Sequence, residues 1–259
     1  IVIVHGGPWS RDYWAYDGHV FNKAAHFFAS RGYAVLQPNF RGSTGFGKHF
    51  INIAEKNWGR GAMQHDITDG VDYLVKQGIA DKDNVGIMGA SYGGYATLSG
   101  LTFTPDVFKA GISYVGPSSL ITLMESFPDY YRPYLGNWFT GVGDPLIEAD
   151  RVDMAYRSPI NYVDNIKAPL MLLQGANDPR VTQKESDNIA RVMYKKGLPV
   201  EYYLAKDEGH GFRKKNNGQA SILAMEAFFA KHLGGAQSKI EDEQIAEHLS
   251  SLQVDISKL

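Results

Sequence analysis

Short apolar runs alternate with longer amphipathic segments along most of the chain. Each run has the length of a strand and is bounded by turn residues, which indicates strands that are buried on both faces. Strands are therefore predicted at 1–4, 34–38, 85–89, 110–115, 170–174 and 200–204. Strands that alternate with helices favour an α/β fold, a mostly parallel sheet with helices on both faces.

The segments between these strands carry apolar residues at helical spacing. Helices are predicted at 66–77, 183–196 and 218–233, and each can cover one face of the sheet. The last of them completes the sheet domain, so we place the boundary of this domain at residue 235.

Two segments depart from this alternation. Residues 118–157 are rich in Tyr, Phe, Trp, Pro and Gly without clean periodicity. We interpret them as a helical insertion beside a functional site of the protein. The alternative is an aromatic cluster that is a satellite of the core. In the tail at 236–259, Ser238 and Glu241 have the spacing of a capping box, and a helical stripe follows. We expect this tail to dock on its own domain, with dimerisation or disorder as the alternatives.

The composition narrows the class of protein. The 259 residues are 44% apolar, which is enough for one large core. The formal net charge of -2 offers no broad field for nucleic acid or an anionic membrane. Cysteine is absent, which excludes disulfides and thiol catalysis and leaves the cellular compartment open. No apolar run of the sequence approaches the roughly 18 residues of a membrane span.

A G-x-S-x-G motif occupies residues 89–93, directly after a predicted strand and before a segment that can form a helix. A serine in this context lies on a tight turn that lifts its hydroxyl above the sheet edge. The following helix points its amide end toward developing negative charge. We therefore predict Ser91 as a nucleophile, with a chance match in a glycine-rich chain as the alternative.

A serine hydroxyl needs a histidine base that a carboxylate holds in one tautomer. Asp178 and His210 follow the last two predicted strands. Because ligands bind at the carboxyl ends of parallel strands, we expect Ser91, Asp178 and His210 to converge on one crevice. Asp164 and Asp207 are the competing acids. The remaining histidines are assigned surface or structural roles: His5, His19, His26, His49, His65, His232 and His248.

The oxyanion of a tetrahedral intermediate needs N–H donors. One predicted donor is the backbone N–H of Tyr92, the residue after the nucleophile. The other comes from the turn at 5–8, where Gly7 is preferred to Gly6 and Pro8 has no N–H to donate.

Taken together, these motifs resemble the catalytic domain of the prolyl oligopeptidase family, in particular its acylaminoacyl-peptidase and dipeptidyl-peptidase members. The matching segments are 5–8, 39–43, 45–47, 89–95, 177–181 and 209–211, with Trp58, Gly59, Asp66 and Asp69. They extend over nearly the whole chain to residue 233, whereas many esterases share only G-x-S-x-G and a glycine-rich turn.

The resemblance implies the α/β-hydrolase fold and a serine peptidase that cleaves short peptides near the amino terminus, without metal or cofactor. It supports the triad and the oxyanion donors named above, and it places Arg157 near the site. Tyr95 and the aromatic insertion are expected to line a pocket for an apolar residue at the scissile position. An oligopeptide is the expected partner, and a homo-oligomer is compatible with the sequence.

Members of this family carry an amino-terminal β-propeller, which this chain lacks. The strands usually numbered one and two are missing as well, because the sequence opens inside the third strand. We therefore expect residues 1–235 to be the peptidase domain of a longer polypeptide, followed by the helical tail at 236–259.

Two rival functions use the same residues differently. A carboxylesterase would apply the triad to esters, and ester turnover without amide turnover would favour it. A catalytically silent binding module usually loses a triad member, whereas all three positions are filled here. In either enzyme, activity should fall as the pH drops through about 6 to 7, where an ordinary histidine protonates.

Overall fold

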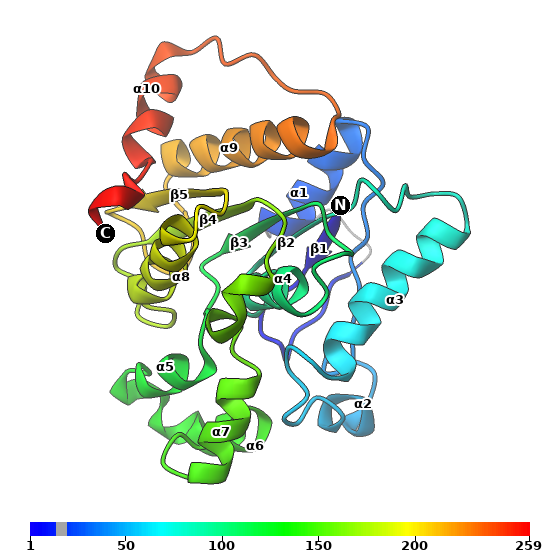
Figure 1. Cartoon of the computed structure of the whole chain (residues 1–259), viewed down its shortest axis with the longest axis vertical. Coiled ribbons are helices and arrows are strands. Elements are labelled where there is room, and N and C mark those ends of the chain that lie inside the picture. Colours follow the sequence, from blue (N-terminus) through cyan, green and yellow to red (C-terminus); the bar gives the residue numbers. More distant parts are fainter. Residues whose placement is uncertain (14–19) are drawn as a thin grey trace.

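The computed structural model describes residues 1–13 and 20–259 of the chain. Within these residues, a five-stranded parallel sheet forms the centre, and its strands lie side by side in chain order (Figure 1). The strands are β1 (Val2–Val4), β2 (Gly86–Ala90), β3 (Ala110–Tyr114), β4 (Leu170–Gly175) and β5 (Val200–Ala205). The predicted α/β fold is confirmed.

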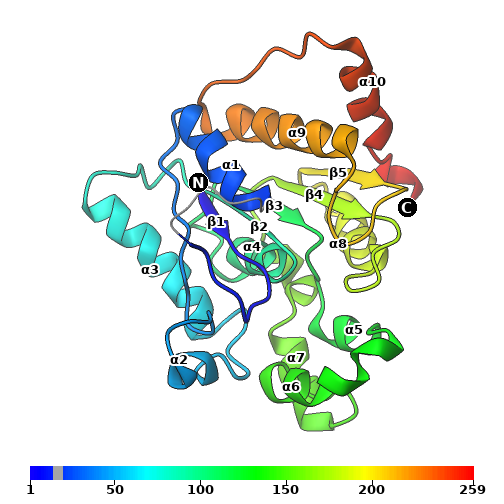
Figure 2. The same ribbon diagram turned by 180° about the vertical axis from the view of Figure 1, so that it is seen from behind.

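Helices cover both faces of this sheet (Figures 1 and 2). One face carries α3 (Ala62–Lys76), α4 (Tyr92–Phe103) and α8 (Gln183–Lys195), and the other carries α1 (Val20–Ser30) and α9 (Lys215–Leu233). Successive strand residues point to opposite faces. In β4, Leu170 and Leu172 join one apolar core, while Met171 and Leu173 join the other. The residues of β1 to β4 are almost all buried on both faces, which is why these strands read as continuous apolar runs.

The prediction of a strand at 34–38 is wrong. This segment meets β1 through a single parallel bridge between Val2 and Leu36. In it, the Ile3 N–H donates to the Leu36 carbonyl at 2.8 Å. Pro38 has no N–H with which to extend a ladder, so the pairing stops after one bridge.

Sequence periodicity located α3, α8 and α9 more accurately than it located their first turns, and it did not predict α1. α8 begins at the predicted residue, whereas α3 begins at Ala62 instead of 66 and α9 at Lys215 instead of 218. In α9, Lys215 and Asn216 are exposed and therefore carry no apolar period. Helix starts of this kind depend on backbone geometry more than on hydrophobic pattern.

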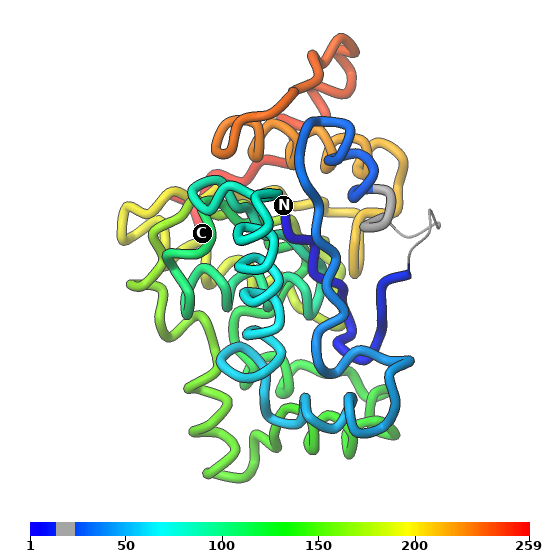
Figure 3. The backbone as a smooth tube through the Cα atoms, turned by 90° about the vertical axis from the view of Figure 1, so that its right-hand side faces the viewer, coloured from blue at the N-terminus to red at the C-terminus, as the bar shows by residue number. Residues whose placement is uncertain are grey.

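Residues 118–157 form a helical insertion that lies at one end of the molecule, away from the sheet, near α2 (Lys48–Asn52) (Figures 1 and 3). It comprises α5 (Leu120–Glu125), η1 (Asp129–Tyr134), α6 (Leu135–Gly141) and α7 (Glu148–Tyr156), and η2 (Pro159–Asn165) leads back to the sheet. The buried carboxylate of Glu185 on α8 anchors the entry, since it accepts the N–H groups of Ser118 and Ser119 at 2.8 and 3.0 Å. The helical character agrees with the prediction.

The tail contains α10 (Glu243–Leu252) and η3 (Ile256–Lys258). The capping box predicted at Ser238 is wrong, because the N-cap of α10 is Asp242, whose carboxylate accepts the N–H groups of Gln244 and Ile245 at 2.9 and 3.3 Å. The Ser238 hydroxyl instead donates to the buried Glu226 carboxylate at 2.9 Å. A buried acceptor elsewhere in the fold thus takes the hydroxyl that the pattern assigned to a helix cap.

After α10, the chain returns to the sheet. Gln253 forms an antiparallel bridge with Tyr203 of β5, and the Val254 N–H donates to the Tyr202 carbonyl at 2.8 Å. β5 is the last strand in the sheet order, so the tail pairs with part of an edge whose polar groups would otherwise face solvent.

Candidate active site

Ser91 lies on the sharp turn between β2 and α4. Its φ of 57° and ψ of -118° fall in a region that residues with a side chain rarely adopt. Glycines make the turn feasible: a Cβ at Gly93 would lie 2.0 Å from the Val4 carbonyl oxygen, and one at Gly89 would lie 2.6 Å from the same atom. The Ser91 N–H donates to the Tyr114 carbonyl at 2.9 Å, which ties the turn to β3.

Asp178 and His210 are hydrogen bonded to each other. Nδ1 of His210 lies 2.6 Å from Oδ2 of Asp178, whose side chain is 0% exposed. The other carboxylate oxygen accepts the backbone N–H groups of Arg180 and Val181 at 2.9 and 3.0 Å. Because an ionised carboxylate only accepts, Nδ1 of the imidazole carries the hydrogen and Nε2 of the neutral ring is an acceptor.

The two competing acids have other partners. Asp164 is exposed and forms an ion pair with Lys196. Asp207 pairs with Lys214 at 2.6 Å, and the hydrogen bond from this lysine lowers the pKa of the Asp207 carboxyl. The geometry therefore favours Asp178 as the partner of His210.

The loops that carry Asp178 and His210 lie directly against each other. A Cβ at Gly175 would lie 2.1 Å from the Gly209 carbonyl oxygen, so only glycine allows this approach. The Asn177 N–H donates to the Glu208 carbonyl at 2.9 Å and joins the two loops. Sequence reasoning assigned no supporting role to these residues, although their position beside the predicted acid and base is a usable signal.

The turn at 5–8 lies beside the nucleophile. A Cβ at Gly6 would lie 2.9 Å from the Ala90 carbonyl oxygen and 3.4 Å from the Cβ of Ser91. Gly7 has a φ of 121°, which favours glycine, and the following bond to Pro8 is cis. The turn is thus placed so that its amides can face the serine.

His5 holds this turn from behind, as its predicted structural role requires. Its Nδ1 lies 2.8 Å from the Gly6 carbonyl, its Nε2 lies 2.8 Å from the Ser43 hydroxyl, and its ring stacks on Phe40 at 4.3 Å. Burial of the ring lowers the pKa of His5.

A cavity of about 210 Å³ brings the candidate residues together. It is lined by Gly7, Trp58, Ser91, Tyr92, Pro117, Leu123, Phe127, Tyr131, Trp138, Arg180, Val181 and His210. The candidate nucleophile, the candidate base and both candidate oxyanion donors therefore line the same cavity. Asp178 is hydrogen bonded to the base. Because Phe127, Tyr131 and Trp138 come from the insertion, part of the insertion belongs to the site and not to a separate aromatic core.

Tyr95 and Arg157 are not among the described residues that line this cavity, so the structure does not bring them together with the other predicted site residues there. Tyr95 is 0% exposed, and its hydroxyl donates to the Arg157 carbonyl at 2.7 Å. Burial raises the pKa of Tyr95 above its usual range, so the phenol stays neutral. Both side chains are buried: the Tyr95 hydroxyl has the Arg157 carbonyl as its partner, and the Arg157 guanidinium has the Asp153 carboxylate and the Val142 carbonyl.

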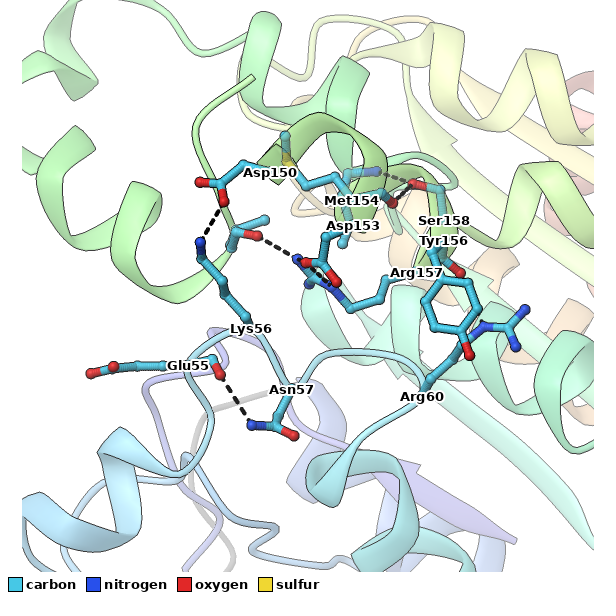
Figure 4. A network of polar contacts seen from close by, with 12 residues as sticks. Glu55, Lys56, Asn57, Arg60, Asp150, Asp153, Met154, Tyr156, Arg157 and Ser158 are labelled. Atoms are coloured by element: carbon cyan, nitrogen blue, oxygen red, sulfur yellow. Dashed lines mark hydrogen bonds and ion pairs between the residues drawn. The ribbon is translucent and has the colours of Figure 1, made fainter. Parts of the chain in front are cut away.

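Arg157 connects α7 with the end of α6. Its guanidinium donates to the Asp153 carboxylate, with Nε at 2.8 Å, and to the Val142 carbonyl (Figure 4). The insertion is also tied to the loop at 55–60, where Lys56 forms an ion pair with Asp150 (Figure 4). These contacts fix the insertion that supplies the aromatic wall of the cavity.

In the part of the chain that the structure describes, no group of three or more His, Cys, Asp or Glu side chains is arranged to hold a metal ion. No described helix combines the length and apolar character that crossing a bilayer requires. Of the remaining histidines, His26, His49 and His65 are exposed, and His19 falls outside the described residues.

Comparison with known sequences gives consistent matches. The model of the prolyl oligopeptidase family matches residues 19–236. Dipeptidyl aminopeptidase BIII of Pseudoxanthomonas mexicana is 48% identical over 240 residues, which cover 93% of this chain and 34% of that protein. Dipeptidyl peptidase family member 6 of Caenorhabditis elegans is 44% identical over 245 residues, which cover 94% and 32%. The chain thus spans about a third of the length of these curated relatives.

Comparison with solved structures agrees. A puromycin-hydrolyzing peptidase of Mycobacterium tuberculosis superposes with a TM-score of 0.84 at 34% identity, over 93% of this chain and 35% of that one. The acylaminoacyl peptidase of Pyrococcus horikoshii superposes with a TM-score of 0.78 at 30% identity, over 95% and 38%. Both coverages again leave most of the larger protein unmatched.

Proposed function

The chain belongs to the prolyl oligopeptidase family, and we propose that it acts as a serine peptidase that hydrolyses short peptides near their amino terminus. The observation that carries this proposal is the hydrogen bond between Asp178 and His210 beside a cavity that Ser91 and His210 both line. The names of the relatives, a dipeptidyl aminopeptidase and an acylaminoacyl peptidase among them, support amide hydrolysis over other acyl transfer.

In the proposed mechanism, Oγ of Ser91 attacks the scissile carbonyl while Nε2 of His210 takes its proton. The imidazolium that forms is stabilised by the buried carboxylate of Asp178, which stays ionised. His210 then returns the proton to the leaving amine, and the C–N bond breaks to leave an acyl-serine. A water activated by the same histidine hydrolyses the ester and restores the serine hydroxyl.

We assign the oxyanion of the tetrahedral intermediate to the backbone N–H groups of Tyr92 and Gly7. Tyr92 is the first residue of α4, and the first amides of a helix have no intrahelical acceptor. The partial positive charge of this helix end adds to the stabilisation. Loss of one such donor costs about two to three orders of magnitude in turnover.

The substrate proposed for this cavity has an apolar or aromatic side chain at the scissile position. Trp58, Phe127 and Trp138 offer ring faces and edges, and Leu123 and Val181 complete an apolar wall. The ring centroids of Trp58 and Trp138 are 6.0 Å apart, and those of Phe127 and Trp138 are 4.8 Å apart, so the wall is continuous. An apolar side chain gains free energy there by leaving water.

The test is hydrolysis of a panel of free and acetylated aminoacyl and X-Pro nitroanilides beside short nitrophenyl esters. Ser91→Ala should lower turnover roughly a million-fold, as nucleophile loss does in other triad enzymes. Ser250→Ala, at an exposed position of α10, is the matched control and should retain full activity.

Each outcome is decisive. Amide cleavage that the Ser91 variant loses supports the peptidase and identifies its class. Ester cleavage without amide cleavage replaces it by a carboxylesterase. A folded protein that neither turns over the panel nor reacts with a fluorophosphonate would be a silent binding module.

A further inference from the structure

The loop that carries His210 is clamped by the carboxylate of Glu208. Glu208 is 5% exposed, and its Oε1 accepts the backbone N–H groups of Arg213 and Lys214 at 2.9 and 2.7 Å. The carboxylate therefore joins the beginning of the loop to its end, with His210 between them. Charge-assisted bonds to a buried carboxylate are among the stronger hydrogen bonds in proteins.

Asn217, in the first turn of α9, extends this clamp. Its Nδ2 donates to Oε1 of Glu208 at 2.9 Å and to Oδ1 of Asp207 at 3.0 Å, and the residue is 2% exposed. Since both partners are carboxylate oxygens, the amide nitrogen must face them, and its oxygen faces the opposite way. The orientation of this side chain is thus determined by its partners.

The amide oxygen of Asn217 meets the tail. Nε2 of His248, on α10, lies 2.7 Å from Oδ1 of Asn217. An amide oxygen only accepts, so Nε2 of His248 carries the hydrogen and donates. A continuous line of hydrogen bonds therefore runs from the tail through Asn217 and Glu208 to the loop of His210.

Apolar side chains also connect α10 with the loop that carries His210. Leu249 and Leu252 of α10 belong to the same apolar cluster as Phe212, which lies two residues after His210. The Phe212 N–H in turn donates to the Tyr114 hydroxyl. α10 lies across the beginning of α9, beside β5 (Figures 1 and 2).

From this network we propose that His248 is a positioning residue, which acts through Asn217 and Glu208 to hold the loop that presents His210. The tail would then be a working part of the site, although it follows the region that matches the family, which ends at residue 236. The inference rests on the proposed role of His210 as the base.

The test compares His248→Leu, which removes the donor, with His248→Gln, which restores an N–H donor. His65→Leu, at an exposed position of α3, is the matched control. Two kinds of measurement are made on the full chain: amide hydrogen exchange of Phe212, Arg213 and Lys214, and steady-state kinetics (kcat and KM) with the best substrate of the panel.

His248→Leu should speed exchange of these amides about threefold to tenfold, which is what loss of one net hydrogen bond allows. It should lower kcat by a similar factor and leave KM within about twofold, because the cavity wall is unchanged. His248→Gln should restore most of both quantities, and His65→Leu should match the wild type. A tail that only adds bulk stability would not be rescued by glutamine.

The two proposals can fail separately. Unchanged exchange in His248→Leu would overturn the positioning role, whatever the activity. Faster exchange with unchanged kcat would also overturn it, because the loop would then move without affecting catalysis. If the wild type neither hydrolyses the panel nor reacts with a fluorophosphonate, the proposed function fails, and with it the role assigned to His248.

Discussion

At the residue scale, the hydrogen bonds around Asp178 define how the proposed acid is held. Its carboxylate is buried, and three N–H donors approach it from two loops. Two of them are backbone amides, which hold the carboxylate in place independently of the imidazole. The histidine thus finds an acceptor that is already oriented, which lowers the reorganisation needed when positive charge develops on the ring.

Asp178→Asn should keep this shape and lower turnover by about four orders of magnitude, because an amide no longer selects the tautomer in which Nδ1 carries the hydrogen. The measurement is kcat on the best panel substrate. Asp164→Asn, which alters an exposed acid paired with Lys196, is the control and should change kcat little. Near wild-type turnover in Asp178→Asn would remove Asp178 from the proposed triad.

His5 is a second residue whose ionisation matters, here for stability. The Gly6 carbonyl only accepts, so Nδ1 of His5 donates to it and Nε2 accepts from the Ser43 hydroxyl. Burial lowers the folded-state pKa of His5 below the value of an unfolded chain, which is about 6.5. Between the folded-state pKa and this value, the unfolded chain binds a proton that the folded protein does not bind. The free energy of unfolding therefore falls as the pH falls through this range.

His5→Gln should therefore flatten the dependence of the free energy of unfolding on pH below about 6.5. The total stability change that the variant loses is about 1.4 kcal/mol for each unit by which the pKa is lowered. Urea unfolding at a series of pH values gives both curves. Parallel curves for the variant and the wild type would show that His5 does not contribute to the pH dependence.

At the scale of elements, the site depends on how closely α4 crosses β1. The Val4 carbonyl occupies the space that a Cβ at Gly93 would need, and the Ser91 turn follows from this contact. Side chains at this crossing would push the helix away from the sheet and carry the nucleophile with it. The glycines of the elbow thus serve packing as well as backbone conformation.

Gly93→Ala should destabilise the protein by several kcal/mol, beyond the roughly 1 to 3 kcal/mol typical of overpacking, because the obstructing atom belongs to backbone. Gly218→Ala is the contrasting change, since nothing lies within 4 Å of the added Cβ in α9. It should stabilise the protein by about 0.5 to 1 kcal/mol through helix propensity. Urea midpoints measure both; a stable Gly93→Ala protein would mean that β1 and α4 can separate at little cost.

At the scale of the whole molecule, the cavity lies between two parts of the chain, the parallel sheet and the helical insertion at 118–157. The sheet edge supplies Ser91 and His210, and the insertion supplies the rings of Phe127, Tyr131 and Trp138. Their relative placement depends on Glu185 at the entry of the insertion, with Arg157 bracing its end. Substitutions that remove the hydrogen bonds of Glu185 or Arg157 should therefore shift the aromatic side chains that line the cavity.

Arg157→Lys should destabilise the protein by about 1 to 3 kcal/mol and raise KM for aromatic substrates, because an ammonium cannot reproduce the fork that bridges Asp153 and Val142. Arg132→Lys, in an exposed ion pair of the same insertion, is the control and should leave both quantities unchanged. Thermal unfolding and KM are measured together. An unchanged KM in a destabilised Arg157 variant would separate the insertion from substrate binding.

The sequence by itself determined the five strands of the parallel sheet and the helices α3, α8 and α9, because apolar periodicity reflects burial directly. It also led to Ser91, Asp178 and His210, since each follows a strand and the carboxyl ends of parallel strands meet at one edge. The sequence also indicated where backbone segments pack closely, because glycine at residues 89 and 93 marks a crossing of α4 and β1 that leaves no room for a side chain. These features depend on residues near one another in sequence, or on one general rule of topology.

Only the tertiary structure decided where the remaining side chains point. Tyr95 follows the elbow and was expected in the pocket, yet it faces the core because its hydroxyl bonds to the Arg157 carbonyl. Ser238 has the spacing of a helix cap, yet its hydroxyl binds Glu226. The tie between His248 and the His210 loop likewise joins residues far apart in sequence. Such contacts depend on which surfaces meet when elements pack, and no local pattern encodes that choice.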